Sequence, residues 1–386
     1  MNVYVRELST ALARAGVECD VYTRAWDPEV PAVVPVEPGL RVHHVPAGPL
    51  APVAKEWLPP LVEEFTDGVL TRLERAEAPD AIHANYWLSG LVGHVLKHRL
   101  GIPLVCTFHT LDRVKAEAMP EDVGAAGPAQ RAQAEATIIE CSDAVLASCP
   151  VEADQLVELY GAERDRIGIV APGVDHAFFA PGHRPQARRA LGLPERGPML
   201  LFVGRIQPLK GADVAVAALA ELRAVEDAFL VVVGGPSGPD GAGELAHLHR
   251  LARELDLGDR VRFVSPQPHE LLSTYYRAAD VCLVPSRTES FGLAALEAAA
   301  CGTPVVGSAV GGLLTLVDHG KTGFLVEGRD PSRFAAYAAE LVTRPELARA
   351  TGEAAARVAR RYTWSIAAGR LRRLYRDLTQ KQLVEC

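Results

Sequence analysis

Two carboxylates, Glu289 and Glu297, mark the part of the chain whose residue types and spacing point most directly to chemistry. They lie in RTESFGLAALEAAACGTPVV, residues 287–306, where a polar segment leads into an Ala/Leu-rich run. This pattern predicts Glu289 just before a helix N-terminus and Glu297 roughly two turns inside the helix. The helix dipole and free N–H groups favour an anion, and each carboxylate can accept hydrogen bonds from two hydroxyls. A nucleotide-sugar is a ligand with hydroxyls at both ends and an anionic middle.

The same spacing also describes a simpler arrangement, a helix with a capping acid and one surface glutamate. The SFGL segment, the CGTPVV strand and Gly311–Gly312 favour the ligand site over that alternative.

A second group of charged residues lies in GRIQPLKG, Gly204 to Gly211, between the strand MLLFV and a helix. Arg205 and Lys210 are thus predicted on a loop at the carboxyl edge of a parallel sheet, where open α/β folds bind ligands. Two cations beside a helix N-terminus suit a diphosphate, although a solvated loop is the alternative for this motif alone. The motif does not fit the Walker pattern.

The stretch VVVGGPSGPDG, Val231 to Gly241, superficially resembles a dinucleotide fingerprint but lacks GxGxxG. We interpret it as a tight strand-to-helix turn beside the nucleotide base, and its composition disfavours a nicotinamide oxidoreductase.

Polar residues also follow strands in the first half of the chain, in HANYWLSG and TFHTLDRVK. His109 and Thr110 end a strand and are expected to face a ligand crevice, although an isolated histidine is more often structural. Lys55, Tyr86 and Arg131 are individually unremarkable and would be surface residues by default.

The composition is that of an ordinary globular protein, with 386 residues, 48% hydrophobic and 23% charged. A net charge of −8 argues against broad nucleic-acid binding. The seven cysteines form no CxxC pair, so we expect reduced core residues in a cytoplasmic protein. No apolar run reaches the roughly 20 residues of a membrane span, and Arg6 and Glu7 interrupt any signal peptide.

Strand-like and helix-like segments alternate throughout, which predicts an α/β protein with two Rossmann-like, doubly wound parallel sheets. Strands are predicted near residues 17–23, 40–46, 80–84, 103–108, 143–148, 167–171, 199–203, 228–233, 260–264, 280–285, 303–307 and 323–326. Helices are predicted near residues 3–15, 55–77, 87–100, 127–141, 150–160, 211–222, 242–255, 268–279, 292–301 and 331–342.

A Pro/Gly-rich stretch near 170–185 predicts a domain boundary. We expect an N-terminal domain of residues 1–178 and a C-terminal domain of residues 179–363. The amphipathic helix that begins at Trp364 is expected to pack back on the N-terminal domain with residues 364–386.

Taken together, GRIQPLKG, GGPSGP, YRAADVCLVPS, ESFGLAALEA, CGTPVV and VGGL resemble the GT-B retaining glycosyltransferases of family GT4. The likeness runs through nearly all of the second half. In the first half, MNVYVREL, AKEWLP, YWLSG and HTLDRVK resemble the branch that transfers N-acetylglucosamine to D-inositol 3-phosphate in mycothiol biosynthesis. The resemblance implies two Rossmann-like domains facing a central cleft.

The resemblance also implies roles for individual residues. Arg205 and Lys210 would bind the donor diphosphate, Glu289 the sugar hydroxyls and Glu297 the ribose of UDP. Further donor contacts would come from Gln267, Phe291, Gly292 and Leu293. The acceptor phosphate would be held by Lys55, Tyr86, Thr110 and Arg131, with Asn2 lining the site. The catalytic set would be His109, Arg205, Lys210 and Glu289. No cofactor is implied for the chemistry, but a structural magnesium ion is implied near Tyr276, Arg277, Ala279 and Thr303.

Relatives carry a strand and a Gly-rich turn before the segment MNVY, so we expect the first strand of the N-terminal fold to be absent here. Residues 116–129 also depart from the family pattern. The expected activity is retaining transfer of N-acetylglucosamine from UDP-GlcNAc to a phosphorylated cyclitol. The expected partners are this donor and a small polar acceptor, without nucleic acid, and a homodimer is left open.

Two alternatives to this activity remain. The first is a GT4 transferase that acts on an aminocyclitol or another secondary-metabolite acceptor. The second is a UDP-sugar-binding protein that lacks transferase activity.

Overall fold

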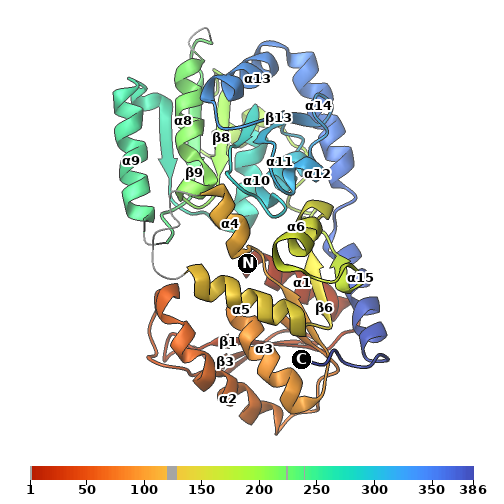
Figure 1. The fold of residues 1–386 in the computed structure, drawn as a ribbon. Coiled ribbons are helices and arrows are strands. Elements are labelled where there is room, and N and C mark those ends of the chain that lie inside the picture. Colours follow the sequence, from red (N-terminus) through yellow and green to blue (C-terminus); the bar gives the residue numbers. More distant parts are fainter. Residues whose placement is uncertain (1, 120–127, 223–224, 239) are drawn as a thin grey trace. The chain divides into compact units, whose positions relative to one another are not determined.

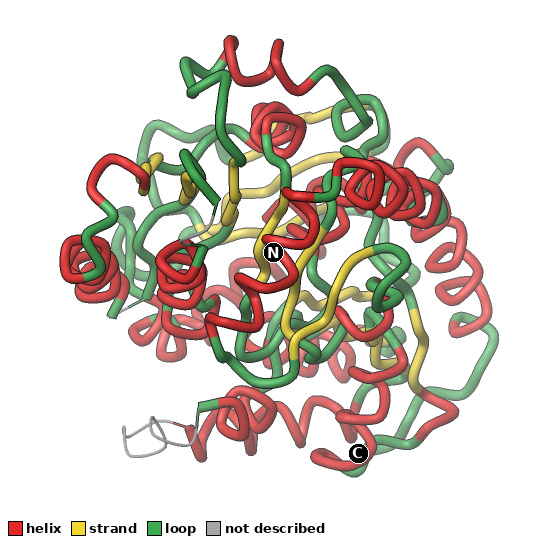
Figure 2. Tube along the Cα trace, turned by 90° about the horizontal axis from the view of Figure 1, so that it is seen from above, coloured by secondary structure: helices red, strands yellow, loops and turns green. Residues whose placement is uncertain are grey.

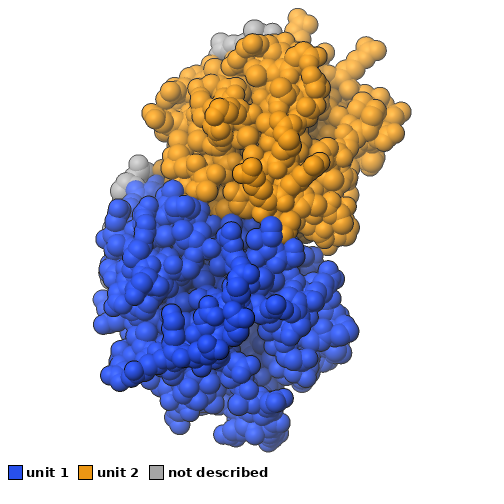
Figure 3. All heavy atoms as spheres, turned by 90° about the vertical axis from the view of Figure 1, so that its right-hand side faces the viewer, with its two compact units in different colours: residues 1–173, 364–386 blue, residues 174–363 orange. Residues whose placement is uncertain are grey.

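The computed structural model describes residues 2–119, 128–222, 225–238 and 240–386. They form two compact units, Met1–Gly173 with Trp364–Cys386 and Val174–Thr363, which are coloured separately in Figure 3. Most of the segment that departs from the family pattern, residues 120–127, lies outside the described residues.

The strands of unit 1 form two separate sheets rather than one (Figure 1). The first has the order β1-β3-β2, with β1 and β3 parallel and β2 antiparallel. The second is parallel, with the order β4-β5-β6-β7. The bounds are β1 Cys19–Arg24, β2 Val33–Glu37, β3 Leu40–Val45, β4 Ile82–Asn85, β5 Leu104–Thr107, β6 Ala144–Ala147 and β7 Ile167–Ile169.

Helices cover these sheets. They are α1 (Asn2–Arg14), α2 (Val62–Leu73), α3 (Trp87–Leu100), α4 (Asp112–Ala118), α5 (Pro128–Cys141), α6 (Pro150–Tyr160) and α15 (Trp364–Leu378). Short 3₁₀ turns occupy η1 (Lys55–Trp57), η2 (Pro59–Leu61) and η4 (Arg164–Arg166). The C-terminal helix α15 belongs to this unit because Trp364 and Leu371 are buried in one apolar cluster with Tyr4 and Leu8 of α1.

Unit 2 contains a single parallel sheet with the order β10-β9-β8-β11-β12-β13. The chain starts at β8, builds outward to β10, and then returns to place β11 beside β8. The loops after β8 and β11 therefore diverge at a topological switch point, where open α/β sheets bind ligands. The bounds are β8 Met199–Val203, β9 Phe229–Val233, β10 Val261–Val264, β11 Val281–Val284, β12 Val305–Ser308 and β13 Gly323–Val326.

The helices of unit 2 flank this sheet, and Figure 2 shows the strands in yellow among the red helices. They are α7 (Arg184–Ala190), α8 (Ala212–Glu221), α9 (Gly241–Glu254), α10 (His269–Ala278), α11 (Leu293–Ala300), α12 (Leu313–Leu316), α13 (Pro331–Thr343) and α14 (Pro345–Ala359), with 3₁₀ turns η5 (Pro208–Lys210) and η6 (Gly258–Arg260). The inner strands β8 and β9 are buried on both faces, as is usual in parallel sheets.

Two further observations concern the chain as a whole. Within the described residues, no helix combines the length and apolarity needed to cross a lipid bilayer. The expectation that all cysteines are unpaired is wrong, because Cys141 and Cys386 form a disulfide with a Cα–Cα distance of 5.4 Å. The pairing was missed because 245 positions separate the two residues in the chain.

Candidate functional site

The loops that follow β8 and β11 are held against each other by main-chain contacts. The Arg287 amide donates to the Leu209 carbonyl at 2.9 Å. Gly211, with φ +73°, lies so close to the other loop that a Cβ there would fall 2.1 Å from the Pro285 carbonyl oxygen. A glycine is required at this position because any side chain would push the two loops apart.

This contact brings together Lys210 and Glu289, which were predicted from separate motifs. The Lys210 Nζ lies 2.7 Å from Glu289 Oε2, and the Ser286 hydroxyl donates to the same oxygen at 3.1 Å. Arg205 is exposed on the loop that also carries Lys210. The loops thus place two cations and a carboxylate at the switch point of the sheet.

The predicted glycine pair, Gly311 and Gly312, contacts the main chain of Glu289 and helps to position it. The Gly312 amide donates to the Glu289 carbonyl at 2.8 Å. A Cβ on Gly311 would fall 1.9 Å from that carbonyl oxygen, so the backbone approach is as close as the absence of a side chain permits. The loop that carries Glu289 is therefore fixed at both ends.

Helix α11 begins beside this loop, at Leu293, with Gly292 as its N-cap at φ +97°. Its N-cap makes no side-chain hydrogen bond, so the main-chain N–H groups of the first turn are not capped from within. The neighbouring Phe291 is buried and packs edge-on against Tyr362 at 5.4 Å. The helix end can therefore meet an anion with N–H groups and the positive end of its dipole.

Glu297 is buried inside α11, and both of its carboxylate oxygens have partners on α10. His269 Nε2 lies 2.7 Å from Oε1, and the Tyr276 hydroxyl donates to Oε2 at 2.8 Å. Burial raises the pKa of Tyr276, which keeps its hydroxyl protonated as a donor. Each carboxylate oxygen has a second lone pair, so a ribose hydroxyl can still add to this cluster.

Two other segments that were predicted to contact the nucleotide-sugar lie beside these loops. The GGPSGP turn runs beside GRIQPLKG. The Ile206 main-chain N–H donates to the Gly235 carbonyl at 2.8 Å, and the Gln207 side-chain amide donates to the Ser237 carbonyl at 3.1 Å. Gln267 follows β10 at the same edge of the sheet and donates to the Ser265 carbonyl at 2.9 Å.

The residues expected near magnesium gather at the C-terminal end of α10. The Thr303 hydroxyl donates to the Tyr276 carbonyl at 2.6 Å, and Ala279 donates to the same carbonyl at 3.2 Å. The Arg277 guanidinium binds the Ala180 carbonyl at 2.9 Å. The Tyr276 carbonyl thus accepts two hydrogen bonds, Arg277 is a cation, and the set has no carboxylate, so as arranged these residues do not fit a magnesium ion.

In unit 1, three of the four residues expected to hold a phosphate lie together. Arg131 donates to the carbonyl and hydroxyl oxygens of Thr110 at 2.7 and 3.3 Å. Its guanidinium lies over the Tyr86 ring, 5.1 Å from the centroid. Glu135, fully buried one turn along α5, accepts from Arg131 Nε at 2.8 Å. Arg131 is therefore oriented by Glu135 and brings its charge to the hydroxyl-bearing Thr110 and Tyr86.

The remaining acceptor residues have looser surroundings. Lys55 lies on the exposed turn η1, where its Nζ is 3.7 Å from Glu56 Oε1. Asn2 is exposed at the start of α1. Neither position is tied to the cluster around Arg131 by any contact that the structure records among the described residues.

His109 directly precedes Thr110 in unit 1 and has a left-handed backbone, φ 62°. Its Nε2 pairs with Asn85 Oδ1 at 2.9 Å, and its ring contacts Tyr4 at 4.7 Å. Burial lowers the pKa of His109 to about 3, so the imidazole is neutral near pH 7. Strained backbone in a non-glycine residue is frequent at functional sites.

Several contacts within these clusters were not predicted from the sequence. Ser286, His269 and Tyr276 contact the two predicted glutamates, and Glu135 orients Arg131. Only Arg131 and Glu135 carried a sequence signal, their i,i+4 spacing on one helix. The other contacts join segments whose proximity depends on the fold.

Comparison with known proteins matches the chain in both halves. Residues 183–358 match the model of glycosyl transferases group 1, and residues 1–173 match that of a glycosyl transferase 4-like domain. The chain is 47% identical over 378 residues, 95% of its length and 87% of the relative's, to D-inositol 3-phosphate glycosyltransferase 2 of Catenulispora acidiphila.

Two solved structures share the fold of this chain. Sucrose-phosphate synthase from Thermosynechococcus elongatus superimposes with a TM-score of 0.90 at 36% identity, covering 98% of this chain and 93% of that one. Anabaena HepE, in complex with UDP-glucose, shares the fold with a TM-score of 0.74 at 20% identity, covering 87% of this chain and 86% of that one.

Proposed function

The chain belongs to the group 1, GT4-type glycosyltransferases, and we propose that it transfers N-acetylglucosamine from UDP-GlcNAc to a hydroxyl of a phosphorylated cyclitol, with retention of configuration. The name of its relative contains D-inositol 3-phosphate, and 1D-myo-inositol 3-phosphate is the acceptor that we expect. The pairing of Lys210 with Glu289 at the sheet switch point carries the donor part of the proposal.

The donor site is argued from charge placement. Lys210, Arg205 and the uncapped N-terminus of α11 supply positive potential to a diphosphate. Glu289 lies close enough to contact a nucleotide-sugar whose diphosphate is bound by Lys210. Its carboxylate can accept hydrogen bonds from hydroxyls, so it suits the sugar of that donor. A UDP-sugar in the HepE complex supports this ligand class.

The chemical step follows from these positions. As the bond between the anomeric carbon and the diphosphate breaks, negative charge develops on the leaving phosphate, and Lys210, Arg205 and α11 stabilise it. The acceptor oxygen attacks the same face, and the leaving phosphate oxygen takes the acceptor proton. Glu289 holds sugar hydroxyls and is not required as a nucleophile. The configuration at the anomeric carbon is retained because the diphosphate leaves from the same face of the sugar that the acceptor attacks.

The acceptor site is argued from the cluster around Arg131. A guanidinium that lies beside the Thr110 hydroxyl and over the Tyr86 ring can supply charge-assisted hydrogen bonds of the kind that hold phosphate. Lys55 would join the Arg131 cluster when the acceptor phosphate binds. Neutral His109 would contact the bound sugar through its ring rather than act as a cation. We place the reaction in the cytoplasm.

The sucrose-phosphate synthase likeness favours a second acceptor class, a hexose phosphate. A donor and acceptor screen separates the candidates. UDP-GlcNAc and UDP-glucose are each incubated with inositol 3-phosphate, inositol, an aminocyclitol and a hexose phosphate, and products are measured by mass spectrometry. The proposal predicts a product from UDP-GlcNAc with inositol 3-phosphate. A product only with the unphosphorylated aminocyclitol would refute the acceptor assignment, and UDP-sugar binding without any product would favour the binding-protein alternative.

A further inference from the structure

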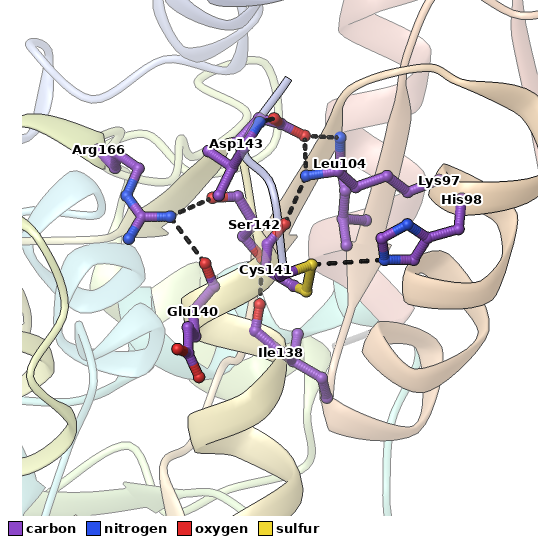
Figure 4. Close-up of a disulfide and its surroundings, with 11 residues drawn as sticks. Lys97, His98, Leu104, Ile138, Glu140, Cys141, Ser142, Asp143 and Arg166 are labelled. Atoms are coloured by element: carbon purple, nitrogen blue, oxygen red, sulfur yellow. Dashed lines mark hydrogen bonds and ion pairs between the residues drawn. A yellow bond between two sulfur atoms is a disulfide. The ribbon is translucent and has the colours of Figure 1, made fainter. Parts of the chain in front are cut away.

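Four metal-ligating side chains meet in unit 1, and none of them belongs to the cluster around Arg131. His94 and His98 lie one turn apart on α3, Cys141 ends α5, and Cys386 is the last residue described. The ligand atoms of all four lie within 4.8 Å of one another. The Cys386 sulfur is 3.4 Å from His98 Nε2. Figure 4 shows His98 directed toward the disulfide of Cys141.

From this juxtaposition we propose that the reduced chain binds one zinc ion through His94, His98, Cys141 and Cys386. Two thiolates and two imidazoles form the donor set of a closed structural zinc site. Bonds of about 2.3 Å to sulfur and about 2.0 Å to nitrogen place tetrahedral ligands roughly 3.3–3.8 Å apart. The four ligand atoms already lie within 4.8 Å of one another before any side chain moves.

A second observation points to a ligand here. The Nδ1 of His94 is buried but has no hydrogen-bond partner within the part of the chain that the structure describes. A buried ring nitrogen without a partner is costly, and a metal bond to the imidazole would remove part of that cost. The rings of His94 and His98 also approach edge to face at 4.8 Å, as neighbouring ligands on one helix face would.

The surroundings of the cluster are charge-balanced and rigid. Lys97, between the two histidines, donates to the Cys141 carbonyl at 2.7 Å and pairs with Asp143 at 3.0 Å, and both side chains are buried. Asp143 also accepts from the Val384 amide at 2.7 Å, which fixes the C-terminal segment beside the site. A zinc ion with two thiolates is neutral overall, so it adds no uncompensated charge next to this ion pair.

Zinc and the disulfide compete for the same sulfur atoms. Zinc binding forms two Zn–S bonds and releases the two thiol protons, whereas the disulfide forms when those sulfurs lose two electrons to an oxidant. In the reduced chain, zinc would fasten the C-terminal segment to α3 and α5. The inferred role is therefore structural, and it does not depend on the proposed transferase activity.

The test uses the full chain without a histidine tag, purified in the presence of a non-thiol reductant. Bound zinc is measured by elemental analysis, and cobalt is added to metal-free protein as a spectroscopic probe. We expect about one zinc per chain and the visible d–d and thiolate charge-transfer bands of tetrahedral cobalt. His98→Ala and Cys386→Ser, both at exposed positions, should lose the zinc and the bands.

Cys19→Ser and His247→Ala serve as matched controls outside the cluster and should keep both signals. His98→Ala retains both sulfurs, so it also separates metal binding from disulfide formation. Reduced wild-type chain without zinc or a tetrahedral cobalt spectrum would overturn the proposal. Equal zinc content in wild type and His98→Ala would also overturn it.

Discussion

Lys210 and Glu289, 79 positions apart in the chain, form an ion pair with 2.7 Å between Nζ and Oε2. The pair exists because β8 and β11 are neighbours in the sheet and the loops after them are joined through Gly211 and Pro285. A diphosphate-binding cation and a hydroxyl-binding carboxylate are thus positioned by the same backbone contact.

Lys210→Ala should lower turnover by about 10² or more, because the cation stabilises the leaving diphosphate in the transition state. The melting temperature should fall somewhat while the fold is kept, because Glu289, whose side chain is 15% exposed, loses its cation. Steady-state kinetics with saturating acceptor measure the effect. Lys321→Ala, at an exposed lysine paired with Asp318, is the matched control and should behave as wild type. Wild-type turnover by Lys210→Ala would remove the diphosphate assignment.

Gly311→Ala should weaken donor binding and turnover, because its Cβ would lie 1.9 Å from the Glu289 carbonyl oxygen and shift that loop. Gly320→Ala is the control, since that glycine also has a positive φ but has nothing within 4 Å of its Cβ position. Both variants carry the cost of a left-handed alanine, about 1 kcal/mol. Donor binding is measured by titration with UDP, and turnover is measured by steady-state kinetics, for both variants. Equal activity of the two variants would show that the position of the Glu289 loop is unimportant.

Arg131 should set the affinity for the acceptor phosphate. Replacing it alone would leave Glu135 buried without its cation, which can cost about 3–5 kcal/mol of stability. The double variant Arg131→Gln/Glu135→Gln avoids this charge. It should fold and raise the KM for a phosphorylated acceptor at least about tenfold, since a charge-assisted hydrogen bond contributes roughly 1.5–3 kcal/mol.

The donor KM provides the internal control for this double variant and should stay near the wild-type value. A KM for inositol 3-phosphate that does not change would exclude Arg131 from phosphate binding.

Acid should destabilise unit 1 through His83. This half-buried ring pairs with the Tyr375 hydroxyl at 2.6 Å and the Thr107 hydroxyl at 2.8 Å, and desolvation lowers its pKa from 6.5 to about 4. Between these values the unfolded chain binds the proton and the folded chain does not, so stability falls as pH decreases from about 6.5 to 4. The loss attributable to His83 approaches about 3 kcal/mol.

Denaturant unfolding at several pH values checks this prediction. His83→Gln should be less stable than wild type at neutral pH but should show a shallower decline towards pH 4. An identical pH slope in the two proteins would contradict the role of His83.

Much of this architecture could be predicted from sequence pattern alone. The predicted helix bounds 87–100 agree with α3, and the strand 323–326 agrees with β13. The loops were placed correctly because Gly, Pro and charged residues directly follow short β-rich runs. The strand β2 was missed because it is an antiparallel strand with a bulge at Pro35 and largely lacks buried residues.

Contacts between remote segments could not be predicted in the same way. No local pattern indicates that Tyr276 and His269 meet Glu297, or that Cys386 returns to Cys141. These pairings depend on how whole helices pack, and a one-residue change in register would remove them. Family likeness supplied Lys55 and Asn2, for which neither pattern nor contact gives an independent reason.

The most direct test of the proposed transferase is the stereochemistry of one reaction. The full chain is incubated with UDP-GlcNAc and 1D-myo-inositol 3-phosphate, and the products are followed by NMR. We predict UDP and a glycosylated inositol phosphate in equal amounts, with the sugar in the α configuration of the donor. A β-configured product, or UDP-GlcNAc that binds and stays intact in the presence of the acceptor, would contradict the account.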